Sequence, residues 1–408
     1  MRAPGAESCQ TQDQFSLTTS EQIRAFTGPA VLSFGFRPFF LAGAVWAALA
    51  VALWLPVLSG HVTLPSAFAP SEWHAHELVY GYVPAVIAGF LLTAVPNWTG
   101  RLPVTGLPLL GLFTIWLAGR LSVLCSAWIG AWPAAVIDLL FLAALTAVIA
   151  REIIAGQSTR NLKVLAVLAL LFVGNAIFHA EVLFETATAY GTRVGVSAVI
   201  LLVMVIGGRI IPSFTRNWLA KHSSKRLPVP FNRLDIGILM LSAVALAGWI
   251  TAPVHPATAT LLSIAALANT VRLARWAGER TLAEPLVLIL HTAYACVPLG
   301  FALLAISIWR PDVVAPSGAL HGWTTGAIGL MTLAVMTRAA LGHTGQALTA
   351  TRPIQLIYAI AVVAVGTRII AAFDILREPM LHVSALAWVL AFAGFVVVYA
   401  PHLLRRQA

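Results

Sequence analysis

Long apolar stretches separated by short polar segments run from about residue 38 to residue 403. A helix needs about 20 apolar residues to cross a bilayer, and by that rule the pattern predicts twelve spanning helices. Prolines stand at or just before several predicted starts, where the missing N–H costs nothing. The predicted spans are 38–59, 73–95, 106–126, 130–150, 161–182, 190–212, 234–252, 256–277, 283–308, 317–341, 354–373 and 382–403.

Composition supports the same fold class. Hydrophobic residues make up 59% of the 408 residues and charged residues only 10%, whereas soluble domains carry roughly a quarter charged residues. The sequence therefore predicts an all-α polytopic membrane protein, with one transmembrane domain over 38–403 between tails 1–37 and 404–408. The partner that this composition implies is the lipid bilayer. The net charge of +10 reports topology rather than a nucleic-acid partner.

Basic residues alternate between the predicted loops. Most of the 25 Lys and Arg residues fall in every second loop or in the two tails. The exceptions, which belong to the opposite side, are Arg120, Arg193, Arg310, Arg368 and Arg377. Because loops rich in Lys and Arg stay in the cytoplasm, we expect both termini to be cytoplasmic.

The second and tenth predicted spans begin alike. Aligning His76 with His321 also aligns four further identical pairs: Gly81 with Gly326, Ala94 with Ala339, Thr99 with Thr344, and Gly100 with Gly345. The sixth span echoes parts of the pattern without an N-terminal histidine. The alignment suggests three four-helix units, 38–150, 161–277 and 283–403.

The matching histidines are the first candidate metal ligands. Imidazole is a common ligand of haem iron and copper, so we expect His76 and His321 to hold one metal centre. Residues two apart on a helix point about 200° away from each other. His74 therefore joins His76 only if it precedes the first turn, with Ser71 as the N-cap. The alternative for each residue is an ordinary interfacial histidine.

Further polar groups lie at or within the spans. Glu77 shares a stripe of small residues with Gly81, so we expect it to face the interior near the metal as a catalytic proton relay. His179 is a metal-ligand candidate, with Glu181 orienting it or relaying protons, unless both belong to a solvated loop. Ionisable groups inside a span, here His291 and Asp138, are functional candidates or helix-packing residues.

Three candidates lie at the cytoplasmic ends of predicted spans. Arg209 and Arg338 are most simply topology anchors, although an arginine also binds anionic groups such as a haem propionate. His343 is a further candidate haem ligand at this end. None of these residues falls within an apolar core.

Four segments resemble those of the NnrS family: GFRPFF (35–40), WHAHE (73–77), GGRIIP (207–212) and MTRAALGHTG (336–345). The resemblance extends from about residue 35 to the C-terminus. It implies a twelve-helix protein of the bacterial inner membrane that contains haem b and copper. It also implies a role in nitric oxide metabolism, denitrification or the response to nitrosative stress.

The helical plan also resembles the main subunit of haem–copper oxidases and nitric oxide reductases, where the second and tenth helices hold haem. Copper ligands come there from the sixth and seventh helices, whose counterparts here lack histidine in their apolar cores. This leaves His74, His179, His291 and His343 as candidates without a partner. An oxidoreductase acting on nitric oxide, with its electron donor unidentified, is one prediction. A transporter or export pore, or a scaffold for other metalloproteins, is the alternative.

The charge pattern makes a direct prediction about topology. Reporters fused after Arg160 and Arg226 should give cytoplasmic signals, and reporters near Glu185 and Asp312 should give periplasmic ones. Paired phosphatase and fluorescent-protein fusions measure this. A cytoplasmic signal at Asp312 would mean a miscounted span and would break the alignment of the second span with the tenth.

Overall fold

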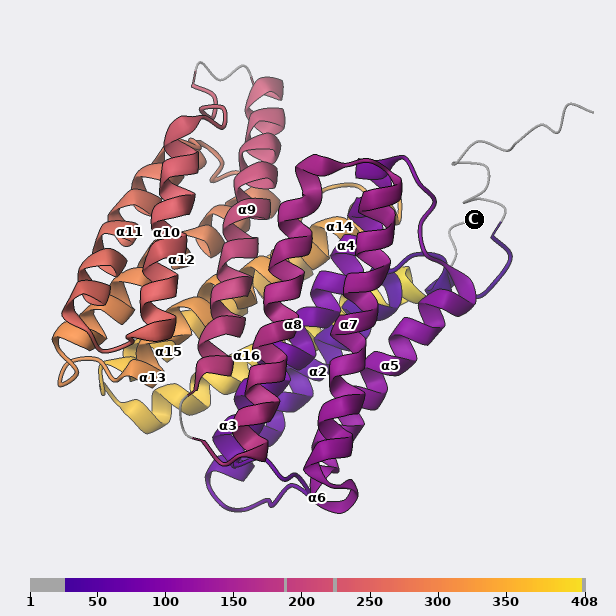
Figure 1. Ribbon diagram of the computed structural model, residues 1–408. Coiled ribbons are helices and arrows are strands. Elements are labelled where there is room, and N and C mark those ends of the chain that lie inside the picture. The colour runs from indigo at the N-terminus through magenta and orange to yellow at the C-terminus, as the bar shows by residue number, and fades with distance from the viewer. Residues whose placement is uncertain (1–25, 187–188, 223–225, 406–408) are drawn as a thin grey trace, which may run out of the picture.

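The computed structural model describes residues 26–186, 189–222 and 226–405, and this part of the chain is a helical bundle without strands (Figure 1). Twelve of its helices are long and apolar enough to cross a membrane, which confirms the predicted all-α polytopic fold. Most of the predicted tail 1–37 lies outside the described residues. Its last residues already belong to the first span, because α2 begins at Phe36.

The spans follow the predicted order with small shifts at their ends. The second span begins at Pro70 rather than at residue 73, and the sixth continues past Pro212 to Lys221. A proline is tolerated inside a membrane helix where neighbouring groups satisfy the freed carbonyl. The spans are α2 (Phe36–Leu58), α3 (Pro70–His76) with α4 (Val83–Thr99), α5 (Gly106–Leu124), α7 (Ala131–Ala155), α8 (Leu162–Leu183), α9 (Tyr190–Lys221), α10 (Arg233–Thr251), α11 (Pro256–Ala274), α12 (Pro285–Trp309), α13 (Pro316–Ala319) with α14 (Leu330–His343), α15 (Arg352–Ala372) and α16 (Arg377–Leu404). A short helix, α6 (Ser126–Ile129), follows α5.

Four spans form the interior of the bundle. The second, sixth, ninth and tenth have 72–83% of their apolar windows buried, compared with 33–39% for the other eight. The sixth span packs against the second and the tenth, and α14 packs against α4. Polar groups on these inner spans are therefore shielded from lipid by the surrounding helices.

The order of neighbouring helices repeats every four spans. The pairs α5·α7, α10·α11 and α15·α16 pack side by side at equivalent places in the chain. The pairs α7·α8, α11·α12 and α16·α2 join one group of four to the next, so that the last span closes on the first. This order supports the three predicted four-helix units, whose boundaries stay a prediction.

The second and tenth spans share an unusual local structure. Each contains a wide π-helical segment directly after or close to its histidine: η2 (Glu77–Tyr82) follows His76, and η5 (Gly322–Gly329) follows His321. The paired glycines at the far ends, Gly100 and Gly345, both have left-handed backbone angles, with φ of 70° and 62°. Segments of π-helix occur often at functional sites. The aligned residues therefore have matching local conformations.

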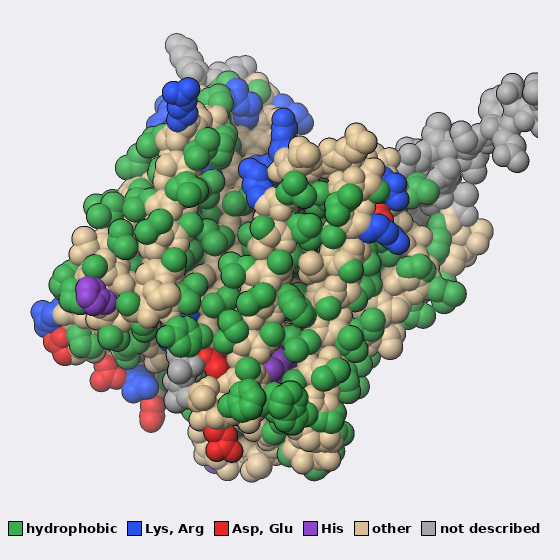
Figure 2. Space-filling model, viewed as in Figure 1, with side chains coloured by type: hydrophobic (Ala, Val, Ile, Leu, Met, Phe, Trp, Pro, Cys, Tyr) green, Lys and Arg blue, Asp and Glu red, His purple; other side chains and the backbone are tan. Residues whose placement is uncertain are grey.

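Charge separates the two ends of the bundle. Most of the Lys and Arg side chains visible in Figure 2 lie at the upper end, around the C-terminus of α9, and most Asp and Glu side chains lie at the lower end. We call the end at Lys221 the basic end, and the end where the second span begins at Pro70 the opposite end.

Candidate metal centre

Six buried polar side chains form a closed cluster near the opposite end, and we call them the His76 cluster. None of the six is more than 2% exposed. Charged residues at this depth in a membrane protein are rare and usually functional. The members are His76 and Glu77 from the second span, Arg120 from α5, Asp138 from α7, and Asn175 and His179 from α8.

Two imidazoles and one carboxylate of this cluster have the spacing of a metal site. One ligand atom from each of His76, Asp138 and His179 lies within 4.8 Å of the other two. The Nε2 atoms of His76 and His179 are 3.2 Å and 2.9 Å from the same oxygen, Asp138 Oδ2. Two imidazoles with one carboxylate are a common ligand set for transition metals.

Glu77 and Arg120 fix the orientation of these ligands. His76 Nδ1 lies 3.1 Å from Glu77 Oε1, which leaves Nε2 facing the site. Glu77 Oε2 accepts hydrogen bonds from Trp46 Nε1 at 2.7 Å and from Arg120 Nη1 at 2.6 Å. Arg120 Nη2 donates to Asp138 Oδ1, so that Oδ2 remains for the histidines. A carboxylate behind the ligating imidazole is a typical feature of metal centres.

The fixed charges of the cluster do not cancel. Glu77 and Asp138 contribute two negative charges and Arg120 one positive charge, which leaves one negative charge in a buried region. An unbalanced charge is costly where the dielectric constant is low. One added positive charge would neutralise the cluster, either a proton on an imidazole or a monovalent cation bound between the two histidines.

Two glycines make room for Arg120 and for the Asp138 carboxylate that it binds. A Cβ atom at Gly81 would lie 2.3 Å from Arg120 Nη1, and one at Gly119 would lie 2.9 Å from Asp138 Oδ1. Trp116 Nε1 donates to the Gly81 carbonyl at 2.9 Å and ties α5 to the π-helical segment. Larger residues at these positions would push the helices apart and separate Arg120 from its two carboxylates.

Phe68 covers the two imidazoles on the outer side. Its ring centroid lies 5.3 Å from that of His76 and 5.7 Å from that of His179. The segment that carries it is fixed to the start of α6: Ser66 Oγ donates to the Val123 carbonyl at 2.9 Å, and the Ala67 N–H donates to Ser126 Oγ at 2.8 Å. The cluster is therefore separated from solvent by an anchored aromatic side chain.

His74 belongs to a different group from His76. The helix begins at Pro70 with Ala69 as its N-cap, so Ser71 is not the cap and His74 lies within the helix. The two rings consequently point away from each other, as residues two apart on a helix must. The His74 ring stacks on Trp54 with centroids 4.4 Å apart.

His321 lies near His74 rather than near the His76 cluster. The charge of Arg368 acts on both imidazoles, and His321 and His74 also interact electrostatically. His321 Nδ1 is 2.7 Å from the Ser317 carbonyl, which leaves its Nε2 as the nitrogen available to a ligand. The structure thus places His76 beside His179, and it places His74 and His321 within electrostatic reach of each other. The expected pairing of His76 with His321 at one metal stays a prediction.

Three other candidate residues make contacts outside the His76 cluster. His291 Nε2 is 2.8 Å from Thr215 Oγ1, while its Nδ1 is buried without a partner among the described residues. The His343 ring packs against Phe36 with centroids 5.6 Å apart. The Glu181 carboxylate accepts the backbone N–H groups of Tyr190 and Gly191, at 2.6 and 3.0 Å, and so caps the first turn of α9.

Arg209 and Arg338 contact residues at the basic end. Arg209 Nη1 donates to Asn161 Oδ1 at 3.1 Å, and the Arg338 guanidinium lies 3.9 Å from the Phe214 ring centroid. These contacts hold helix ends together. They place both arginines far along the bundle from the His76 cluster, at the other ends of the spans.

Sequence reasoning missed two arginines that the structure buries. The charge pattern used such residues only to assign topology, yet Arg120 and Arg272 lie inside α5 and α11 and are at most 1% exposed. Arg272 Nε donates to Asp235 Oδ1 at 3.1 Å, and its Nη1 donates to the Tyr294 hydroxyl at 2.8 Å. The sequence signal for such a contact was a charged residue inside one predicted span and an acidic or polar residue inside a neighbouring span.

Comparison with known proteins adds one match. A family model described as NnrS protein matches residues 30–407, which is nearly the whole chain. The search of curated proteins finds no match.

The charge balance of the His76 cluster gives a stability prediction. Arg120→Gln leaves two buried carboxylates without their cation and should lower the free energy of unfolding by about 3–5 kcal/mol. Glu77→Gln combined with Arg120→Gln should recover part of that loss, because one unbalanced carboxylate is removed. Thermal unfolding midpoints in detergent measure the order of stability of the wild type, the single variant and the double variant.

Arg310→Gln is the control, because Arg310 forms an exposed ion pair with Asp312 at the same end of the bundle. It should leave the midpoint unchanged. A double variant that unfolds at the same temperature as Arg120→Gln alone, or below it, would contradict the proposed charge balance.

Proposed function

The chain belongs to the NnrS family of nitric oxide-associated membrane proteins, and from this membership we propose that it is a haem- and copper-binding protein. We propose that it acts in nitric oxide metabolism or the nitrosative stress response by binding or reducing nitric oxide. Copper would bind in the His76 cluster, and haem b would bind at His74 and His321. Reduction of nitric oxide would make the protein an oxidoreductase with a separate electron donor.

The observation that carries the copper proposal is the convergence of two histidine nitrogens on one carboxylate oxygen. Imidazole nitrogen is a suitable ligand for copper. The single uncompensated negative charge of the cluster matches a monovalent copper ion. A bound copper ion would supply one-electron redox chemistry.

The protein groups around that position have separable tasks. His76 and His179 would provide nitrogen ligands, and Asp138 would provide an oxygen ligand through Oδ2. Glu77 would hold a proton on His76 Nδ1 and keep the imidazole oriented. Metal binding requires neutral imidazoles, so loading would displace the proton that otherwise balances the cluster.

The haem proposal rests on the proximity of His74 to His321. Both histidines stand on inner spans, and the Ser317 carbonyl orients the His321 ring. His74 Nδ1 is buried and has no partner among the described residues, so this polar atom needs a ligand or a proton acceptor. Haem held by both imidazoles would suit electron transfer, and haem held by one would leave a position for nitric oxide.

We propose the bacterial inner membrane as the location, with the basic end and both termini in the cytoplasm. His76 is six residues from the start of its helix at Pro70, and at 1.5 Å per residue it lies roughly 9 Å from that end. The copper site would then lie within the periplasmic half of the bilayer.

A transporter or export pore is the alternative function. Such a protein needs a polar path between the two ends, whereas the polar groups described above form separate closed clusters. Phe68 covers the His76 cluster, and two cavities, of about 240 and 160 Å³, lie at opposite ends of the bundle. These features favour the metalloprotein.

Copper content tests the first part of the proposal. His76→Ala and His179→Ala should each lower the copper stoichiometry of detergent-purified protein by removing one nitrogen ligand, as measured by elemental analysis. His222→Ala is the matched control, because His222 is exposed at the basic end and stacks on Trp218. Unchanged copper in both cluster variants, with expression retained, would refute the assignment.

Optical spectra with and without dithionite test the haem assignment. His74→Ala and His321→Ala should each reduce haem content or change the spectrum, while His402→Ala at the basic end should do neither. Haem that is lost in His76→Ala but kept in His74→Ala would restore the pairing that the sequence alone suggests. Haem unaffected by all of these substitutions would move the ligands to His291 or His343.

A further inference from the structure

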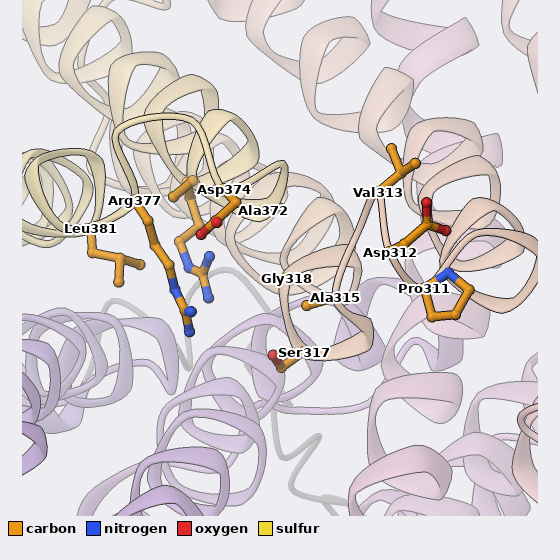
Figure 3. Close-up of a pocket in the computed structure, with 12 residues that line it drawn as sticks. Pro311, Asp312, Val313, Ala315, Ser317, Gly318, Ala372, Asp374, Arg377 and Leu381 are labelled. Atoms are coloured by element: carbon orange, nitrogen blue, oxygen red, sulfur yellow. The ribbon is translucent and has the colours of Figure 1, made fainter.

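A cavity of about 240 Å³ lies at the opposite end of the bundle, between the α12–α13 connection, α13 and the turn from α15 to α16 (Figure 3). Two arginines line it: Arg368 from the last turns of α15 and Arg377 from the first residue of α16. Figure 3 shows Arg377 reaching from α16 toward Ser317 of α13. The cavity is therefore walled by helices and contains two cationic side chains.

Neither arginine has an anionic or hydrogen-bonding partner in the part of the chain that the structure describes. Within the described residues, Arg368 and Arg377 make no hydrogen bond and no ion pair, and the two charges act on each other. The buried arginines Arg120 and Arg272, by contrast, both contact carboxylates. A partly buried arginine inside a span normally pairs with an acid or a carbonyl group.

The nearby carboxylates do not supply the missing charge. Asp312 lines the cavity, but both of its oxygens accept from Arg310, at 2.9 and 2.6 Å. Asp374 also lines the cavity and forms no ion pair with either arginine among the described residues. Because Asp312 is already neutralised by Arg310, which does not line the cavity, the two arginines and Asp374 leave one net positive charge there. This charge matches a monovalent anion.

Arg368 is half-buried, and its helix α15 packs against α13 and against the π-helical segment that follows His321. Its charge acts on His74 and His321, which both stand on inner spans. Ser317 joins the two features, because it lines the cavity and its carbonyl holds His321 Nδ1. The cavity and His321 are therefore adjacent.

We infer that Arg368 and Arg377 bind a monovalent oxyanion in this cavity, beside the imidazoles of His74 and His321. A guanidinium group presents parallel N–H donors that match two oxygens of one planar anion. The volume is below the roughly 300–1,000 Å³ of sites for drug-sized ligands, so it fits a small ion or one edge of a larger ligand.

The oxyanion has two possible sources. One is a carboxylate of the haem proposed at His74 and His321, and this source rests on the proposed function. The other is a free inorganic ion such as nitrite, which has the same planar arrangement of two oxygens. Formate and nitrite are therefore suitable probes, with chloride as the background ion.

The experiment titrates formate and nitrite into full-length protein in detergent by isothermal calorimetry, in haem-loaded and haem-free preparations. Haem-free protein should bind formate saturably, and Arg368→Gln and Arg377→Gln should each weaken binding about 10-fold through loss of a charge-assisted contact. Arg193→Gln is the matched control, because Arg193 lies at the same end and donates to the Ile250 carbonyl. It should bind like the wild type.

The two sources give different results. If haem carboxylates occupy the cavity, haem-loaded protein should not bind formate, and Arg368→Gln should lose haem more readily on dilution. If a free ion occupies it, both preparations should bind nitrite with equal affinity and the arginine variants should retain haem. Because Arg377 is exposed, Arg377→Gln keeps the test valid even where Arg368→Gln fails to fold.

The inference is overturned if formate and nitrite bind neither preparation while Arg377→Gln retains haem as the wild type does. It is also overturned if Arg377→Gln and Arg368→Gln bind the probes as tightly as Arg193→Gln. A protein that never takes up haem would end the haem proposal, yet the titration of haem-free protein would still decide whether the arginines bind an anion.

Discussion

The first half of the bundle is organised around one guanidinium group that bridges two carboxylates inside the membrane. Arg120 binds Glu77 on the second span and Asp138 on α7, and all three are buried. Burying these charges separately would cost several kcal/mol per ion, so the three helices are constrained to meet at this point. Gly81 leaves room for the Arg120 guanidinium, and Gly119 leaves room for the Asp138 carboxylate that the guanidinium binds. The orientation of both imidazoles follows from the carboxylates that Arg120 holds.

Polar contacts between an inner span and its neighbouring helices recur at intervals of four spans. The His76 cluster joins the second span to α5, α7 and α8, and the Arg272 contacts join α9 to α10, α11 and α12, partly through the Met204 carbonyl. In the last group, Thr337 of α14 bonds Tyr358 of α15. Each inner span thus meets the following helices through polar contacts. Among the described residues, only the first group combines two histidines with an acid, and this is the composition of a metal site.

The apolar pattern was sufficient to predict the spans but not the polar contacts between them. Helix length and hydropathy follow from bilayer thickness, so all twelve spans could be found from sequence alone. Which helices are neighbours depends on how they pack. The apolar pattern does not predict this packing, because lipid-facing and helix-facing sides of a span are both hydrophobic. The sequence shows that His74 and His76 would point about 200° apart if both lay in a helix. The structure supplies the missing fact, because the helix begins at Pro70 and includes both residues. The partnership of His76 with His179 required the contact between the second span and α8.

The anchored cover over the His76 cluster has a consequence for the order of assembly. Phe68 is held in place by Ser66, Ala67 and the turn at Ser126, and the imidazoles below it are sealed between helices. An ion in solution could reach them only by detaching this segment, which breaks several hydrogen bonds at once. Insertion of a metal would therefore belong to biogenesis, before the segment between α2 and α3 docks, or would need a delivery protein that opens it. Once enclosed, the ion would exchange with external chelators at the rate of this local opening, however weak or strong its equilibrium affinity.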